Sequence, residues 1–319
     1  MIEGRTLLLE AAGLRIAVCP EEGGALTGFA VRARAGWREL IFRSREPGRW
    51  RGGAPWLFPA VGRNYAAGQL RRLEAGSREP MGSWRHGGRT LPMPLHGFVM
   101  DKAWEAFDAG PSELACRYRS APGTLRFYPF RFELTARYRL LPRGCRATLE
   151  VAASPRNRAP MPFSPGNHLA LALPLARGGD WGSCRVRTPA RSVLELSPQS
   201  LLTGRRRRAS YARGVALARD PALSNLVLGG YPKDGCWLEV SDPGSLRVRV
   251  GQRELVEPGG RPRCDPRRFS FVLWSDETRT FLCPEPWYGA PNSLNEGKGL
   301  VSLAPGGRFA WRMEVTVAG

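Results

Sequence analysis

The chain has 319 residues, of which 42% are hydrophobic and 24% are charged. These proportions are typical of a soluble globular protein and argue against a disordered chain. They also argue against membrane helices, because no run of about 18 apolar residues occurs.

The formal net charge of +20 is a second compositional feature. Such a charge often indicates a nucleic acid or another anionic partner. Here only Lys102, Lys233 and Lys298 are lysines among the 48 basic residues, and the arginines are spread along the chain. That skew is typical of a GC-rich genome. We therefore expect no nucleic-acid partner, and we interpret the dense run Arg205–Arg208 as a solvated loop, with phosphate or RNA binding as the alternative.

The cysteines and the first residues bear on localisation. The chain start, MIEGRTLLLEAAGLRIAVC, carries Glu3 and has no small-residue cleavage site after a long apolar core, so a signal peptide is not expected. No C-x-x-C pair occurs, and an odd number of cysteines cannot all pair within one chain. Reduced thiols in the cytoplasm, with no membrane association, fit best. The seven cysteines are Cys19, Cys116, Cys145, Cys184, Cys236, Cys264 and Cys283.

Short strands dominate the expected secondary structure. The 28 prolines and 38 glycines cut the chain into short pieces that alternate with period two, and this leaves no room for long helices. In 130–140, Phe132, Leu134 and Tyr138 share one face, and mostly charged residues occupy the other. Similar alternation predicts strands in 114–120, 145–153, 236–240, 245–250, 269–274 and 308–317. One apolar face per strand predicts antiparallel sheets packed face to face.

The spacing of chain breakers bears on domain organisation. Breakers recur every 8 to 20 residues with no shift in composition that would mark a linker. We therefore predict an all-β protein, a large antiparallel β-sandwich formed as a single domain over residues 1–319. Neither G-x-G-x-x-G nor G-x-x-x-x-G-K-[ST] occurs, which excludes a phosphate-binding P-loop.

One carboxylate, Glu285, stands between two prolines in CPEPW. Pro284 and Pro286 have fixed φ angles and no backbone donors, so the segment should be extended and stiff. A carboxylate held beside apolar surface should have a raised pKa, which suits a general base near neutral pH. Trp287 offers a flat face for the C–H side of a sugar ring. The sequence alone leaves open an ordinary edge-strand glutamate.

Only three histidines occur, and two of them lie in proline- and glycine-bounded segments. His168 follows the irregular bend MPFSPGN, and His96 lies in LPMPLHGFV, whereas His86 lies in RHGGR and is predicted as loop. Imidazole is well matched to proton transfer at neutral pH, although a core or surface role stays open for each ring. Arg63, in PWLFPAVGRN, can donate several hydrogen bonds to hydroxyls or can be plain surface.

Other chemistries have weaker signals. Two histidines and a carboxylate can form a zinc or iron triad, but no H-x-x-x-H or H-x-[DE] spacing occurs, so we expect no metal and no other cofactor. A serine hydrolase lacks its G-x-S-x-G elbow, and no local signature marks a cysteine nucleophile.

Taken together and in chain order, five segments resemble the aldose 1-epimerase (galactose mutarotase-like) family. They are EEGGALTGFAVRARAGWRELIF, RGGAPWLFPAVGR, MPLHGFVMDKAWE, MPFSPGNHLAL and CPEPWYGAPNSLNEGKGLVSLAPGGR. The resemblance covers most of the chain and implies a supersandwich of antiparallel strands with a sugar cleft on one sheet face. It also implies a small-molecule sugar as the partner, with no cofactor and a monomer or homodimer.

The resemblance further implies roles for individual residues. Glu285 would remove the proton from the anomeric hydroxyl, and His168 would protonate the ring oxygen. His96 and Arg63 would bind and orient the sugar, and Asn167 and Trp287 would contact it. Opening a cyclic hemiacetal needs this pair of proton transfers, and reclosure after rotation about C1–C2 gives the other anomer.

The chain departs from the family pattern in three places. Met100 stands in HGFVM where many bacterial members have an arginine, and this weakens an assignment to a hexose 6-phosphate. No clear match exists for the aspartate that galactose mutarotases place between the second histidine and the glutamate, and Asp220 is the nearest acid. Residues 185–265 match poorly. We expect an epimerase acting on free hexoses, with a hexose-6-phosphate mutarotase or a non-catalytic carbohydrate-binding relative as alternatives.

Overall fold

The computed structural model describes residues 6–34, 36–110, 112–233, 235–255, 262–263, 265 and 267–319. Regular structure in these residues is almost entirely β. The two described α-helices are short: α1 (Ala67–Glu74) and α2 (Ser293–Glu296). Neither has the length or the apolar character to cross a bilayer. The prediction of an all-β protein without long helices is confirmed.

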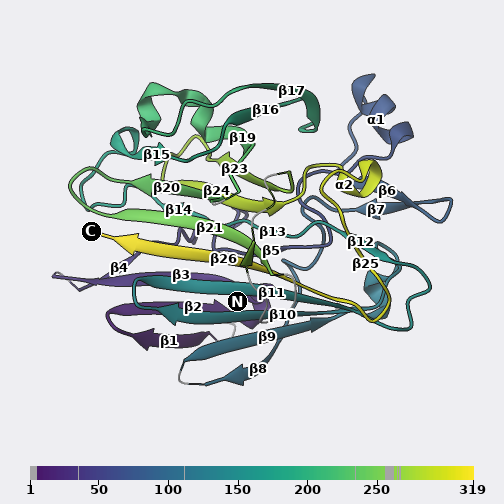
Figure 1. Cartoon of the computed structure of the whole chain (residues 1–319), viewed down its shortest axis with the longest axis horizontal. Coiled ribbons are helices and arrows are strands. Elements are labelled where there is room, and N and C mark those ends of the chain that lie inside the picture. The colour runs from purple at the N-terminus through teal and green to yellow at the C-terminus, as the bar shows by residue number, and fades with distance from the viewer. Residues whose placement is uncertain are drawn as a thin grey trace.

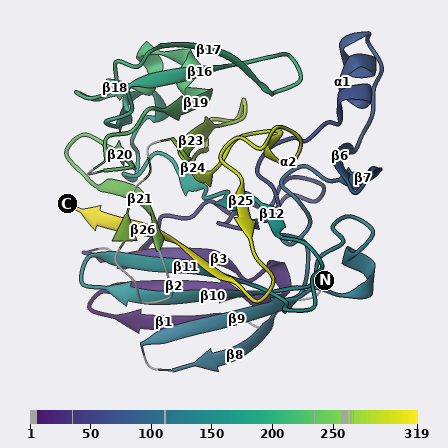
Figure 2. The same ribbon diagram turned by 45° about the vertical axis from the view of Figure 1, so that its right-hand side comes forward.

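Two large antiparallel sheets form the sandwich. In the view, the first extends from the upper part of the molecule to its lower edge, and the second lies in the upper and central part (Figure 1, Figure 2). The first has the order β18 (Val215–Ala216), β15 (Arg185–Arg187), β20 (Trp237–Ser241), β21 (Arg247–Leu255), β26 (Arg308–Ala318), β11 (Gly144–Ala153), β10 (Phe132–Leu141), β9 (Glu113–Arg119) and β8 (Glu105–Ala109), with β22 (Pro262–Arg263) on β21. The second has the order β17 (Leu202–Arg208), β16 (Ser192–Leu196), β19 (Asn225–Gly229), β23 (Phe269–Trp274), β24 (Phe281–Tyr288), β13 (Gly166–Asn167) and β5 (Trp56–Leu57), with β14 (Leu171–Ala172) on β24. We call the second one the site sheet.

Three smaller sheets complete the described fold. The N-terminal sheet has the order β1 (Leu7–Ala11), β2 (Leu14–Cys19), β3 (Ala25–Ala33) and β4 (Gly36–Glu39), and it lies against β9 and β10. The two others are the pair β12 (Met161–Phe163) and β25 (Val301–Leu303) and the hairpin β6 (Gly82–His86) and β7 (Arg89–Met93).

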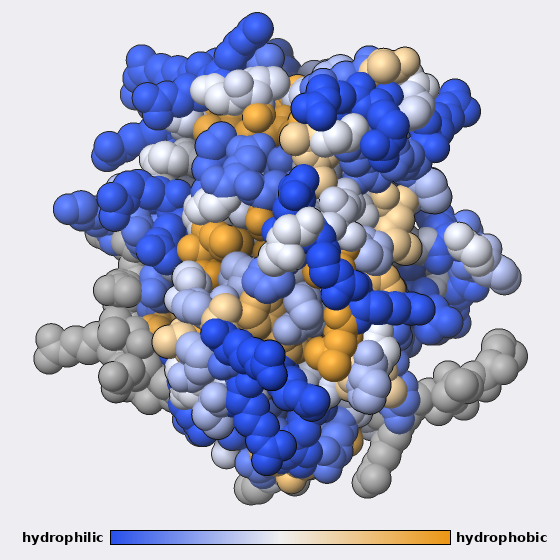
Figure 3. Space-filling model, turned by 90° about the vertical axis from the view of Figure 1, so that its right-hand side faces the viewer, coloured by the Kyte–Doolittle hydropathy of each residue, from blue (hydrophilic) through white to orange (hydrophobic). Residues whose placement is uncertain are grey.

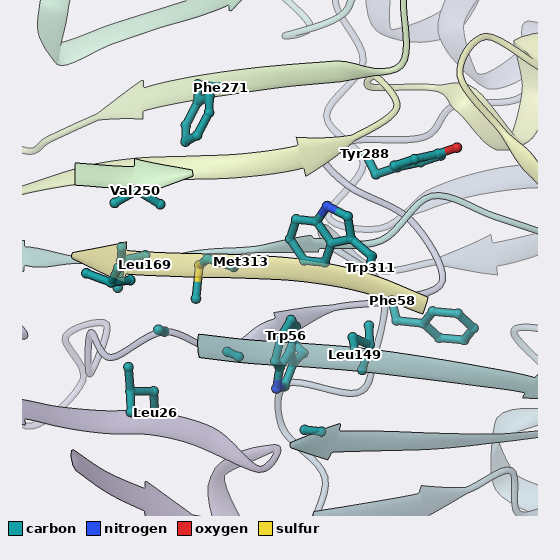
Figure 4. Packing of buried hydrophobic residues seen from close by; sticks show 14 of the residues in the cluster. Leu26, Trp56, Phe58, Leu149, Leu169, Val250, Phe271, Tyr288, Trp311 and Met313 are labelled. Carbon is teal, nitrogen blue, oxygen red and sulfur yellow. The ribbon is translucent and has the colours of Figure 1, made fainter. Parts of the chain in front are cut away.

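The main core lies between the two large sheets, as the period-two pattern requires (Figure 4). Trp56 of the site sheet packs edge-on against Trp311 of β26, with ring centroids 5.9 Å apart. Phe271 and Tyr288 enter the same core from β23 and β24. Alternate residues of each strand are therefore held inward by burial, and this determines which residues of the site sheet point outward.

The predicted strands are found, with two local corrections. Arg205–Arg208 belong to the edge strand β17 and are exposed, so they do not form a loop, and charged side chains on an edge strand discourage pairing with another chain. His86 ends strand β6, and the turn begins at Gly87. The six described cysteines are free and buried, and Cys264 lies outside the described residues.

The polar surface matches the high charge of the chain. The face shown in Figure 3 is mostly hydrophilic, and its hydrophobic residues gather toward the centre. The assignment of residues 1–319 to a single domain stays a prediction.

Candidate active site

The outer face of the site sheet forms the floor of the candidate site. In β24, Leu282 and Tyr288 point inward and belong to the main core. Cys283, Glu285 and Trp287 alternate with them and point to the opposite face. The whole strand is buried, because loops and strand ends cover its outer face. The proline-flanked glutamate is therefore an interior-strand residue and does not lie at a sheet edge.

The prolines around Glu285 face β13 and the residue that follows it, His168. The N–H of Tyr288 donates to Pro165 O at 2.8 Å, so every second residue of β24 directs its backbone polar groups to that side. Pro286 and Pro284 lie two and four residues before Tyr288, so they face the same side as Tyr288, but they have no N–H to donate. The hydrogen-bond ladder is consequently open at this point.

The register across this opening places His168 opposite Glu285. Gly166 of β13 pairs with Trp287 of β24. Continuing this antiparallel register by two residues, past the end of β13, places His168 opposite Glu285. Residues opposite each other in an antiparallel pair share a face, and their side chains are closest where the backbones are not bonded. The backbone N–H of His168 donates instead to Pro55 O at 3.0 Å.

The two side chains meet on the floor of the site. His168 Nε2 lies 3.4 Å from Glu285 Oε1, and Trp287 Nε1 donates to Glu285 Oε2 at 3.1 Å. Glu285 is 2% exposed and His168 is 8% exposed. Nδ1 of His168 is buried and has no hydrogen-bond partner in the described residues, so Nε2 is the nitrogen available for proton transfer.

Burial shifts the pKa values of both groups toward their neutral forms. It raises the pKa of Glu285 well above its usual value, an effect that the hydrogen bond from Trp287 partly opposes. It lowers the pKa of His168 to about 4. A carboxylate with a raised pKa is a stronger base, and an imidazolium with a lowered pKa is a stronger acid. With these opposite shifts, the pair holds one proton between its two members over a wide pH range.

His96 is a hydrogen-bond donor of defined tautomer. The ring nitrogen Nδ1 of His96 accepts a hydrogen bond from the backbone N–H of Gly62 at 3.1 Å. The backbone N–H of His96 donates in turn to Gly62 O at 3.1 Å. Burial lowers the pKa of His96 well below its usual value, and the charges of His168 and Arg63 lower it further. The ring is therefore neutral, and because Nδ1 accepts, Nε2 carries the proton.

The position of His96 depends on the glycine that follows it. His96 itself has a positive φ of 63°, and Gly97 has a φ of 78°. A Cβ on Gly97 would lie 2.0 Å from the carbonyl oxygen of Phe58, so only glycine allows this close approach. The proline- and glycine-bounded segment found in the sequence thus serves to hold the imidazole against β5.

Arg63 enters the site from the segment that follows β5. Its guanidinium donates to Tyr65 Oη at 3.2 Å and forms no ion pair with an acidic residue of the described chain. The remaining donors of the guanidinium can bind ligand oxygens.

These groups line one cavity of about 490 Å³, within the usual range for a small-molecule site. Glu285, His168, His96, Arg63 and Trp287 all line it, so the structure brings together five of the six predicted site residues. The other lining residues are Trp50, Gly62, Leu95, Met100, Leu196, Ser200, Asn225, Val227, Val272, Trp274 and Pro291.

Asn167 is the exception among the predicted residues. It pairs with Trp56, which is fully buried in the core, and so it lies on the inner face of the sheet. Its Nδ2 donates to Ala54 O at 2.9 Å. Adjacent strand residues point to opposite faces, so a segment that directs His168 into the cavity directs Asn167 away from it. The predicted sugar contact of Asn167 is not supported.

Two aromatic walls were missed by sequence reasoning. The Trp50 ring lies 4.5 Å from the His168 ring, and the Trp274 ring lies 5.8 Å from it. Trp274 shares the outer face with Val272, an alternation visible in FSFVLW, where Phe271 faces inward. Trp50 lies in an irregular Arg- and Gly-rich segment that carries no local signal.

The departures from the family pattern also have structural outcomes. Met100 lines the cavity, so an apolar thioether occupies the wall where an arginine was expected from the family. Asp220 does not line it: this carboxylate accepts from Tyr211 Oη at 2.8 Å and from the Ala222 N–H at 3.1 Å. Glu285 is the single carboxylate among the described lining residues.

A metal triad is geometrically conceivable here. Ligand atoms of His96, His168 and Glu285 lie within 4.8 Å of one another. However, the hydrogen bond from Gly62 occupies the Nδ1 lone pair of His96, which leaves Nε2 protonated and without a lone pair for a metal. The donor set therefore fits a metal poorly, and the expectation of a metal-free site stays a prediction.

The described residues form a galactose mutarotase-like β-sandwich, with Glu285 and His168 in contact on one sheet face. The aldose 1-epimerase family model matches residues 5–227. The chain therefore belongs to the aldose 1-epimerase family, which confirms the predicted resemblance. The match includes Arg63, His96 and His168, while Glu285 and Trp287 lie beyond it.

Solved structures show the same fold at low sequence identity. A galactose mutarotase related enzyme from Lactobacillus acidophilus is 20% identical, with a TM-score of 0.79 and coverage of 99% of this chain and 98% of that one. A protein from Synechocystis is 23% identical, with a TM-score of 0.75 and coverage of 99% and 96%. A putative aldose 1-epimerase from Escherichia coli is 17% identical, with a TM-score of 0.71 and coverage of 98% and 99%. No curated protein sequence matches the chain.

Proposed function

We propose that the protein is a cofactor-independent aldose 1-epimerase that interconverts the α and β anomers of a free hexose. The observation that carries the proposal is the 3.4 Å contact between His168 Nε2 and Glu285 Oε1 on a buried, tryptophan-lined cavity floor. A site that only bound sugar would not need a base and an acid with opposed pKa shifts in contact with each other.

The mechanism follows from the two groups. The step starts when the one proton that the pair shares lies on His168. The Glu285 carboxylate then takes the proton of the O1 hydroxyl, and the C1=O1 bond forms as the C1–O5 bond breaks. His168 Nε2–H supplies a proton to O5. After rotation about C1–C2, O5 attacks the other face of C1 and both protons return. The pair holds one proton before and after ring opening, and each proton transfer contributes roughly 10² to 10⁴ in rate.

The remaining groups position the sugar. The Nε2–H of His96 donates to a sugar oxygen, and the Arg63 guanidinium binds hydroxyls. The Trp50, Trp274 and Trp287 rings supply flat apolar faces for the C–H surface of a pyranose.

Two lining features favour a neutral sugar. Met100 places a thioether on the cavity wall, and no lysine lines the described cavity.

A hexose 6-phosphate is the second candidate, because Arg63 has no ion-pair partner in the described residues and remains available for an anion. Inhibition by inorganic phosphate together with a preference for glucose 6-phosphate would identify this alternative.

Polarimetry of freshly dissolved α-D-glucose and α-D-galactose tests the proposal. We expect the rotation to reach equilibrium faster with enzyme than in buffer, and His168→Ala to lose most of the acceleration. His86→Ala is the matched control, because His86 stacks on Trp84 in the β6–β7 hairpin and does not line the cavity. No acceleration with any common aldose would refute the proposal, and sugar binding without turnover would indicate a non-catalytic relative.

A further inference from the structure

A small pocket lies on the outer face of the first large sheet, and we propose that it binds one tetrahedral oxyanion: inorganic phosphate or the phosphoryl group of a phosphate monoester. It lies over β20, β21 and β26, which are neighbours in that sheet (Figure 1). Its volume of about 180 Å³ is below the roughly 300 to 1,000 Å³ of a drug-sized ligand site and suits one small ion with bound water. The site cavity lies on the other large sheet, so this pocket is separate from the proposed function.

The side chains that line the pocket are mostly basic. They include Arg249, Arg253 and Arg312, with Glu314 as the one carboxylate among the described lining residues. Arg253 of β21 pairs directly with Arg312 of β26, and its Nη1 donates to Gln252 O at 3.1 Å. Like charges opposite each other on neighbouring strands repel, so the register favours an anion at this point.

Arg312 is a largely buried cation that makes no hydrogen bond to the described residues. Its side chain is 18% exposed, and its Nε is buried without a partner. Glu314 Oε1 lies 3.9 Å from Arg312 Nη1, and the same oxygen already accepts from Arg146 Nε at 2.7 Å. A buried charge without a hydrogen-bonded partner costs free energy, so an anion bound to this guanidinium would stabilise the folded protein.

The charges around the pocket leave a positive excess. Four guanidinium groups share two carboxylates in the described part of the chain. The ion pairs are Arg187–Glu239 at 3.0 Å, Arg249–Glu239 at 2.8 Å, Arg146–Glu314 at 2.7 Å and Arg312–Glu314 at 3.9 Å. A phosphate dianion would balance the excess of two positive charges, and its bonds to guanidinium groups would be charge-assisted.

Gly251 provides the space for the ion. It lies between Arg249 and Arg253 on β21 and pairs with Trp237 on one side and with Glu314 on the other. A glycine inside a strand weakens the strand and often marks the close approach of a ligand. The Arg249 guanidinium lies 4.2 Å from the centre of the Trp237 ring, so this wall of the pocket is held in place.

Isothermal titration calorimetry with inorganic phosphate, at constant ionic strength in chloride, tests the site. We expect the protein to bind phosphate and Arg312→Gln to weaken the binding about 10-fold or more, because a charge-assisted bond is lost. Phenyl phosphate separates the two sources of the oxyanion, because a free-ion site excludes the ester and a phosphoryl site binds both.

Gly251→Val is a second variant, which fills the pocket and keeps every charge. A Cβ at this position would lie 3.8 Å from Cys236 O and 3.9 Å from Trp237 Cβ, which are ordinary contact distances. Valine is also favoured in strands, so the fold should be retained. We expect this variant to weaken phosphate binding as much as Arg312→Gln does.

Two control variants locate the bound ion. Arg308→Gln removes an exposed arginine of the same strand that does not line the pocket, and Arg63→Gln removes the guanidinium of the site cavity. Both should retain the affinity for phosphate. No binding up to about 10 mM phosphate, or unchanged affinity in Arg312→Gln and Gly251→Val, would overturn the proposal. An equal loss of affinity in either control would place the ion elsewhere and would overturn it too.

Discussion

His168 Nε2 and Glu285 Oε1 lie 3.4 Å apart because His168, directly after β13, faces β24 where two prolines lack the backbone donors of a regular ladder. Tyr288 donates across this interface, but Pro284 and Pro286 cannot. The two prolines that flank Glu285 therefore also interrupt the backbone hydrogen bonds at the point where His168 lies opposite Glu285. The same burial raises the pKa of Glu285 and lowers the pKa of His168, so the pair keeps one proton over a wide pH range.

Replacing Glu285 by Gln should reduce kcat at least 100-fold, because the base for O1 is lost. The amide oxygen can still accept from Trp287 Nε1, so the fold should be retained. Polarimetry measures the activity, and thermal unfolding checks the fold. Full activity in Glu285→Gln would show that another group is the base.

Activity should have a broad pH plateau. The pKa of His168 is about 4. Below that pH, the pair binds a second proton, and no base is left. Above the raised pKa of Glu285, the pair loses its shared proton and no acid remains. The pH profile of kcat/KM reports these free-enzyme values. An acid limb near 6.5, the ordinary value for histidine, would contradict the burial argument.

Folding stability should fall as pH rises above 6.5. The folded pair binds one proton up to the raised pKa of Glu285, whereas the unfolded chain has released both protons above the ordinary pKa of 6.5 for histidine. Because the folded state binds more protons there, the contribution of the pair to the free energy of unfolding decreases as the pH rises. Denaturant unfolding at pH 6.5 and 8.5, compared with the double variant His168→Gln/Glu285→Gln, measures it. If the free energy of unfolding of the protein rose with pH relative to that of the double variant, the result would be inconsistent with a shared proton.

Met100→Arg should shift substrate preference toward anionic sugars. A guanidinium on this wall would join Arg63 and favour glucose 6-phosphate over glucose by roughly 10-fold, since charge-assisted bonds to phosphate are strong. The kcat/KM ratio of the two sugars measures the shift, with Met100→Leu as the size-matched control. An unchanged ratio would mean that the 6-position of the sugar does not point toward this wall.

Chelation should leave activity unchanged, because the neutral His96 presents a proton at Nε2. Activity before and after dialysis against a chelator, together with metal analysis of the protein, tests this. Activity that is lost on chelation and restored by zinc would require the other tautomer of His96.

Much of the architecture was already readable in the sequence. Period-two alternation in 130–140 and 308–317 and frequent breakers predicted the antiparallel sandwich, because burial of one strand face is a local requirement. The prolines around Glu285 predicted a stiff, extended segment that holds the carboxylate beside apolar surface, and they left an edge-strand position open. The segments that carry Arg63, His96 and His168 were recognisable through the family pattern.

Only the tertiary structure decided which side chains share the cavity. Asn167 and His168 are neighbours in sequence, yet the pairing of Asn167 with Trp56 places them on opposite faces. Trp50 enters the site from a segment without local signal, and Asn225 enters from a part of the chain in which the sequence pattern indicated no site residue. Strand register and sheet order depend on contacts between residues more than 100 positions apart, and no local pattern specifies them.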